Sequence, residues 1–216
     1  MSNSTRAVVV HKARDLRVES VGTGEPGPHE VLVAIERGGI CGSDLHYYSH
    51  GAIGTIVLKE PMVLGHEVAG RVIAVGSAVT RVKPSDRVAL SPSRPCNSCR
   101  YCLEGKQMHC LNMRFYGSAM IFPHVQGAFR ERIIATEAQC FVVPEHVSAA
   151  EAAMCEPFAV CLHAVRRAGS LFGRRVLVTG CGPIGALCII AARHAGAAEI
   201  VATDVTPKPF ELAKRL

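Results

Sequence analysis

The sequence predicts an α/β protein in two parts, a β-rich domain over residues 1–147 and a shorter part over residues 148–216. Two observations lead to this prediction. Up to residue 147, short β-branched runs alternate with clusters of turn residues, as they do in irregular β domains. After residue 147, helical patterns alternate with short apolar strands, which is typical of βαβ units with a parallel sheet.

The strands of the first domain are marked by apolar and β-branched residues. Glycine and proline at residues 22–28 separate the first two strands, and a turn at residues 83–86 precedes another. Residues 92–110 show no hydrophobic period, so we expect an irregular loop there. The expected strands are residues 6–10, 31–35, 63–75, 87–90, 128–134 and 140–143.

The second part begins with a helix signal at residue 148. Ser148 and Glu151 have the spacing of a capping box, and the helical pattern continues to about Arg167. Pro157 lies inside this pattern and should kink or restart the helix. The expected elements that follow are a strand at 176–179, a helix at 186–195, a strand at 199–203 and a helix at 210–216.

The composition disfavours several classes of function. The 216 residues carry a net charge of +6 without a long run of lysine or arginine, and only 5% are aromatic, so a nucleic-acid-binding surface is not expected. No apolar run reaches membrane-spanning length, and the N-terminus lacks a signal-peptide pattern. We therefore expect a soluble cytoplasmic protein without a membrane partner, in which clustered cysteines bind metal more often than they form disulfides.

Four of the ten cysteines lie close together, with the spacing C-x2-C-x2-C-x7-C. Four thiolates can surround a tetrahedral zinc ion, and such a site has no open position and stabilises a loop. Buried thiols, disulfides and an iron–sulfur cluster are the alternatives, of which the cluster is the strongest competitor. The sequence favours a structural zinc ion bound by Cys96, Cys99, Cys102 and Cys110.

A second possible metal site combines different donors. Cys41, His66 and Glu67 offer a thiolate, an imidazole and a carboxylate, a mixture that suits zinc in a catalytic site with one open position. Glu156 is a further carboxylate in a mostly apolar helix and needs a partner there. The competing interpretation is that His66 is an ordinary core residue.

Ser43 and His46 follow Cys41 closely in the sequence. A hydroxyl beside the metal, backed by an imidazole, would form a proton relay from a bound alcohol to solvent.

The glycine-rich turn after residue 179 resembles a dinucleotide-binding fingerprint. It follows an expected strand, opens an expected helix, and is followed by Asp204 at the end of the next strand, which is the context the fingerprint requires. Asp204 would accept a hydrogen bond from the adenosine ribose and repel a 2′-phosphate, so NAD is favoured over NADP. A glycine-rich turn of another α/β protein is the alternative. The candidate cofactor-binding residues are Gly180, Gly182, Pro183, Ile184, Gly185 and Asp204.

These three features, in this order, resemble the zinc-containing medium-chain alcohol dehydrogenases, and the likeness covers residues 6–216. Gly65-His66-Glu67, with Gly70 and Gly76, is similar to the zinc signature of that family. Residues 38–48 resemble its polyol branch, the sorbitol and xylitol dehydrogenases, and residues 113–125 carry a finer likeness.

The resemblance implies a GroES-like catalytic domain followed by a Rossmann domain. It implies that Cys41, His66 and Glu67 ligate a catalytic zinc ion and that Glu156 ligates the metal or holds its water. Cys155 is an alternative ligand, and Glu156 is preferred because proline follows it, as in the polyol enzymes. Tyr47 matches a position beside the substrate.

The implied activity is oxidation of a polyol or sugar acid, with hydride transfer to NAD. Zinc lowers the pKa of the substrate hydroxyl, and the proton leaves through Ser43, the cofactor ribose and His46. Catalytic roles are therefore expected for Ser43, His46, Glu67 and Glu156.

The chain ends after two of the six strands of a usual Rossmann domain. We therefore expect a fragment of a longer enzyme, which at full length would be a homo-oligomer. The alternative is a truncated, non-catalytic zinc-binding protein. A quinone reductase of the same superfamily is disfavoured, because those enzymes lack these zinc ligands.

Overall fold

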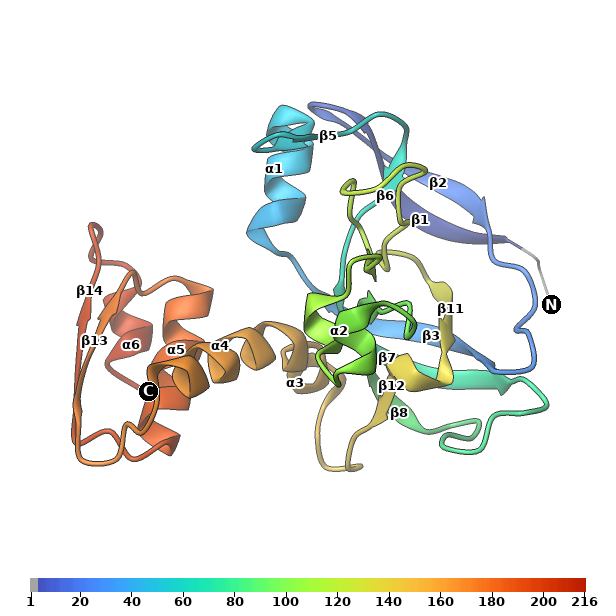
Figure 1. Cartoon of the computed structure of the whole chain (residues 1–216). Helices are drawn as coiled ribbons and strands as arrows, with labels where there is room; N and C mark the ends of the chain where they lie inside the picture. Colours follow the sequence, from blue (N-terminus) through green and yellow to red (C-terminus); the bar gives the residue numbers. More distant parts are fainter. Residues whose placement is uncertain (1–3) are drawn as a thin grey trace. The chain divides into compact units, whose positions relative to one another are not determined.

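The computed structural model describes residues 4–216, which form two compact units (Figure 1). The first unit ends at Glu156, and the second comprises Pro157–Leu216. The first unit thus continues beyond the boundary expected at residue 147, because a short helix after that residue packs on the strands of the first unit.

A five-stranded antiparallel sheet, in the order β11–β3–β7–β8–β12, organises the first unit. Apolar residues at alternate positions of neighbouring strands, such as Val31 and Val33 or Ile133 and Ala135, face one common core. The strands are β3 (Glu30–Gly39), β7 (Glu67–Val75), β8 (Arg87–Leu90), β11 (Arg132–Thr136) and β12 (Cys140–Val142).

A three-stranded sheet, in the order β2–β1–β6, and two short strand pairs complete the strands of this unit. The sheet consists of β1 (Ser4–Lys12), β2 (Asp15–Gly22) and β6 (Met62–Val63). The two antiparallel pairs are β4 (Ala52–Ile53) with β5 (Ile56–Val57) and β9 (Ser93–Arg94) with β10 (Arg114–Phe115).

The helices of the first unit are short, and α3 is the one that extends it past residue 147. The alanines of α3 pack against Ala69 and Ala89 of the five-stranded sheet. The helices are α1 (Gly42–His50), α2 (Arg100–Leu103) and α3 (Ala149–Ala153), with 3₁₀ turns η1 (Gln107–His109) and η2 (Glu137–Gln139).

Several elements of this unit differ from the sequence prediction. The strand expected at 63–75 is divided into β6 and β7, and the short elements β4, β5, β9, β10 and α2 were not expected. Strand β2 was not expected, because most of its side chains are exposed or half-buried. Helix α1 was not expected either, because it is short and polar. The strand expected at 128–134 begins only at Arg132, because the backbone before it binds a loop: Ala128 and Phe129 donate to the carbonyl oxygens of Gly65 and Leu64.

The helix expected from Ser148 is divided in two. Ser148 and Glu151 form the predicted capping box, with the Ser148 Oγ accepting from the Glu151 N–H at 3.2 Å. The first helix ends at Ala153, and α4 runs from Cys155 to Ala168. The predicted restart is therefore confirmed; Pro157 lacks the N–H that would continue the ladder to the carbonyl of Ala153.

The second unit contains a βαβ unit. Strands β13 (Arg175–Thr179) and β14 (Glu199–Thr203) are parallel and joined by α5 (Pro183–His194). Pro183 starts α5 earlier than predicted, since proline suits the first turn of a helix. The last helix, α6 (Phe210–Ala213), is shorter than predicted. Within residues 4–216, no helix is long and apolar enough to cross a bilayer.

Candidate metal centres and dinucleotide loop

The irregular loop brings four sulfur atoms together. The Sγ atoms of Cys96, Cys99, Cys102 and Cys110 all lie within 4.8 Å of one another. The Cys99–Cys102 and Cys96–Cys110 sulfur pairs are 3.6 and 3.5 Å apart. Sulfur ligands about 2.3 Å from a tetrahedral ion lie about 3.8 Å from each other. The group therefore fits one zinc ion. Disulfide sulfurs would be about 2.05 Å apart, and several iron atoms would need more widely separated cysteines.

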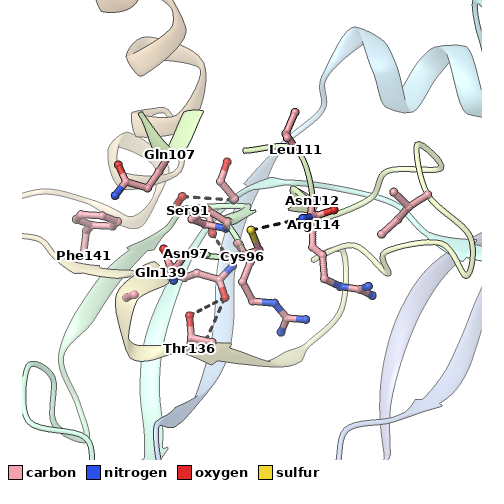
Figure 2. A pocket seen from close by; sticks show the side chains of 15 residues that line it. Ser91, Cys96, Asn97, Gln107, Leu111, Asn112, Arg114, Thr136, Gln139 and Phe141 are labelled. Atoms are coloured by element: carbon pink, nitrogen blue, oxygen red, sulfur yellow. Dashed lines mark hydrogen bonds between the residues drawn. The ribbon is translucent and has the colours of Figure 1, made fainter. Parts of the chain in front are cut away.

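The surroundings of Cys96 and Cys99 lower their pKa and favour the thiolate, the form that binds metal, whereas burial raises the pKa of Cys102 to about 12. The Cys96 and Asn112 N–H groups lie 3.2 and 3.4 Å from the Cys110 Sγ, and both can donate to it. Hydrogen bonds from Ser98, and then from Asn112, lower the pKa of Cys96 to about 5. Figure 2 shows the Asn112 side chain directed at the Cys96 sulfur.

The donors Cys41, His66 and Glu67 also form one group, within 4.8 Å of one another. They meet because β3 ends, and β7 begins, at the register pair Gly39–Glu67. Cys41 follows at the N-cap of α1, and His66 directly precedes Glu67. A Cβ at residue 39 would displace the Glu67 carboxylate, so glycine leaves this carboxylate room to lie where it does.

The electrostatics of this group fit a cation. Burial, and then the charge of Asp44, raise the pKa of Glu67. Burial lowers the pKa of His66, and its Nδ1 is a buried polar atom without a hydrogen-bond partner among the described residues. Buried carboxylates and orphaned imidazoles are stabilised by a metal ion, and cysteine, histidine and glutamate together are a zinc donor set. The residues present therefore fit zinc.

Glu156 lies close enough to interact electrostatically with this group. Burial, and then the charge of Glu67, raise its pKa to about 7. Its oxygens are not part of the three-residue group that lies within 4.8 Å. The role of Glu156 as a ligand or as a holder of the metal's water therefore stays a prediction.

Asp44 and Phe115 complete the surroundings of this group, although the sequence did not mark them. The Asp44 carboxylate is buried and accepts hydrogen bonds from the backbone N–H groups of Cys41 and Gly65, both at 3.0 Å. It therefore ties α1 to the turn that precedes His66. The Phe115 ring lies 5.4 Å from that of His66. An acidic residue in the first turn of a helix is the one local signal for Asp44.

Helix α1 carries the three remaining candidates, which differ in exposure. Ser43 is half-buried and His46 is exposed. Tyr47 is buried: only 2% of it is exposed, and its hydroxyl accepts from the Ala119 N–H at 3.0 Å, while its place beside the substrate stays a prediction. It packs with Met62 in a small cluster that anchors α1, so packing decides its direction.

The glycine-rich turn has the shape that a pyrophosphate group needs. A Cβ at residue 185 would lie 1.8 Å from the Gly180 carbonyl oxygen, so glycine permits the close contact of helix and strand. A Cβ at Gly182 would meet no atom within 4 Å, which leaves open space beside the backbone. Gly182 caps α5 without a side-chain hydrogen bond, so the first N–H groups of α5 have no side chain that competes with a phosphate.

Asp204 lies beside this turn, as predicted. Its carboxylate accepts from the Cys181 N–H at 2.8 Å and from the Thr206 N–H at 2.9 Å. These hydrogen bonds lower its pKa, so the carboxylate is ionised and fixed in position at neutral pH. Together with the space at Gly182, this arrangement fits the adenosine half of a dinucleotide.

Comparisons with known proteins are consistent with this geometry. Residues 27–145 match the family described as alcohol dehydrogenase GroES-like domain. The chain is 48% identical, over 86% of its length, to L-idonate 5-dehydrogenase (NAD(P)(+)) of Escherichia coli K12 and covers 53% of that protein. It is 43% identical to sorbitol dehydrogenase of Gallus gallus over 97% of its length and covers 58% of that protein.

Solved structures give the same result. The crystal structure of L-idonate 5-dehydrogenase from Escherichia coli superposes with a TM-score of 0.91 and 43% identity, over 98% of this chain and 60% of that one. The chain thus spans a little over half the length of the curated relatives described here.

Proposed function

Because the chain belongs to the alcohol dehydrogenase GroES-like family of zinc-containing medium-chain dehydrogenases, we propose that it carries the zinc site and the adenosine-binding turn of a polyol or sugar-acid dehydrogenase. The reaction is hydride transfer between a secondary alcohol, with L-idonate as the first candidate, and NAD. The convergence of Cys41, His66 and Glu67 carries this proposal. The named relatives act on this class of substrate.

The residues of the chain have distinct roles in this reaction. Cys41, His66 and Glu67 hold zinc, with Glu156 beside them, while Asp44 fixes the backbone on both sides of the site. Bound there, zinc supplies a Lewis acid for the substrate hydroxyl, and NAD supplies the hydride acceptor. Four thiolates, from Cys96 to Cys110, hold the second zinc ion, which stabilises the loop.

Ser43 and His46 provide the path for the substrate proton. They lie three residues apart on α1 and therefore on one side of the helix. Ser43 is half-buried beside the metal ligand Cys41, and His46 is exposed, so the Ser43 hydroxyl would take up the proton on the substrate side and the His46 imidazole would release it to water.

His46→Ala should lower kcat by up to about 100-fold near pH 7, because a relay imidazole at the solvent end contributes at the low end of general base catalysis. Raising the pH or adding an amine base should restore part of the rate. The measurement is oxidation of L-idonate and sorbitol by the protein, with zinc content determined in parallel.

His50→Ala is the matched control, since His50 lies one turn further along α1 and its ring is 5.8 Å from that of His46. It should keep the parent rate. Glu156→Ala should instead weaken zinc retention without rescue by base. Loss of zinc in His46→Ala, or full activity and metal in Glu156→Ala, would show that these roles are wrongly assigned.

Asp204→Ala should shift the ratio of kcat/KM for NAD to that for NADP towards NADP by about 10- to 100-fold. A hydrogen bond to a charged group contributes about 1.5–3 kcal/mol, and the repulsion of a 2′-phosphate disappears as well. Glu199→Ala is the control, because it removes the same charge from the start of β14, the strand that Asp204 follows. A parent protein that already prefers NADP would refute the role of Asp204.

Measured oxidation of L-idonate or sorbitol distinguishes a dehydrogenase from the alternative, a non-catalytic zinc-binding protein. A protein that retains about two zinc ions and oxidises neither substrate with NAD or NADP would instead be a non-catalytic zinc-binding protein.

A further inference from the structure

A large cavity lies beside the cysteine loop and includes none of the residues assigned to hydride transfer. Its volume is about 1040 Å³, ample for a metabolite. In Figure 2, Gln107 and Phe141 lie on one side of it and Arg114 on the other. It is lined by the cysteine loop, by the β9–β10 strand pair and by residues around η2.

Two arginines of this cavity are directly opposite each other. Arg94 and Arg114 are register partners across β9–β10, and both line the cavity. Like charges at paired positions of a sheet destabilise it. Neither side chain has an ion pair or hydrogen bond within residues 4–216, and the lining contains no aspartate or glutamate. Both arginines are exposed, so water solvates them here, and an anion between them would offset their mutual repulsion.

The cavity is separate from the catalytic group. Phe115 contacts His66, whereas Arg114, the preceding residue of β10, lines the cavity. Successive side chains of a strand point to opposite faces. An anion held by the arginines would therefore not compete with the alcohol substrate for its site.

The remaining polar groups suit an oxygen-rich ligand. The side-chain amides of Asn97 and Gln107 line the cavity and have no hydrogen-bond partner among residues 4–216. The amide of Gln139, in contrast, is bound at both ends: its oxygen accepts from the Thr136 N–H at 3.1 Å and its nitrogen donates to the Ser91 carbonyl at 2.9 Å.

We propose that this cavity binds a small organic anion whose phosphate or carboxylate group lies between Arg94 and Arg114. Side chains at paired strand positions start about 5 Å apart, so two guanidinium groups can converge on one anionic group and donate several charge-assisted hydrogen bonds. Asn97 and Gln107 bind hydroxyl or carbonyl groups of the same ligand.

The test is calorimetric titration of the zinc-loaded protein with inorganic phosphate and with citrate. We expect saturable binding of at least one of them, and the tighter one identifies the anionic group. Arg94→Gln and Arg114→Gln should each weaken binding at least tenfold, since a hydrogen bond to a charged group contributes about tenfold or more in affinity. The affinity should fall as salt rises.

Arg100→Gln is the matched control, because Arg100 is an exposed arginine of the same loop, stacks on Tyr101 and does not line the cavity. It should bind as the parent does. Zinc content should be unchanged in every variant. The proposal is overturned if neither anion binds saturably, if Arg100→Gln weakens binding equally, or if Arg94→Gln and Arg114→Gln lose zinc. Loss of zinc would mean that Arg94 and Arg114 stabilise the zinc site by offsetting the negative charge of its thiolates, and do not bind an anion.

Discussion

Cys99→Ser should release one of two bound zinc ions and unfold the loop from Cys96 to Cys110. This loop has one four-residue helix, one 3₁₀ turn and no large apolar core, so four metal–sulfur bonds determine its shape. Structural zinc contributes about 10–16 kcal/mol in small zinc-binding peptides. Even a loss of about 3 kcal/mol would lower the Tm by about 10 °C in a chain of this size.

Zinc analysis and thermal unfolding would measure this effect. Cys155→Ser is the control, because Cys155 is exposed and belongs to neither metal-binding group. It should retain both ions and the Tm of the parent. A Cys99→Ser protein with two zinc ions and an unchanged Tm would contradict the structural site.

His66→Ala should remove the other zinc ion and lower kcat/KM by about 1,000-fold or more. Lewis-acid stabilisation of the reacting oxygen contributes several kcal/mol, and each 1.36 kcal/mol is tenfold in rate. The four cysteines are a separate group, so the structural zinc should stay. His109→Ala, at the edge of the cysteine loop, should leave activity unchanged.

The two substitutions together should leave no zinc, and each alone should leave one. If His66→Ala keeps both ions, the group of Cys41, His66 and Glu67 is not a zinc site in this protein.

What the sequence predicted correctly is mostly local. Four cysteines within one loop can meet without any long-range pairing, so their spacing is sufficient. The same holds for Ser148 and Glu151, and for the glycine turn with Asp204, which lie in one βαβ unit. The GroES-like and Rossmann assignment is confirmed by the family and structure matches.

What the sequence did not predict depends on packing between distant segments. Tyr47 is directed into the core by residues of β6 and of the loop around Ala119, none of which its own helix reveals. Asp44 matters because Gly65 comes beside it, and that contact depends on how β3 meets β7. Strand β2 was missed because its exposed side chains lack the apolar alternation that marks a strand.

The pairing of Gly39 with Glu67 also affects how this gene can change. The β3–β7 ladder already contains two irregularities, between Leu32 and Val33 and between Ile35 and Arg37. Side chains alternate along a strand. One residue gained or lost between Arg37 and Gly39 would therefore turn the side chains at the end of β3 to the opposite face of the sheet and move Cys41 away from Glu67. Surface substitutions in β2 leave this alignment intact. Natural variation near the site should therefore consist of substitutions, while in-frame insertions and deletions accumulate in the loops elsewhere.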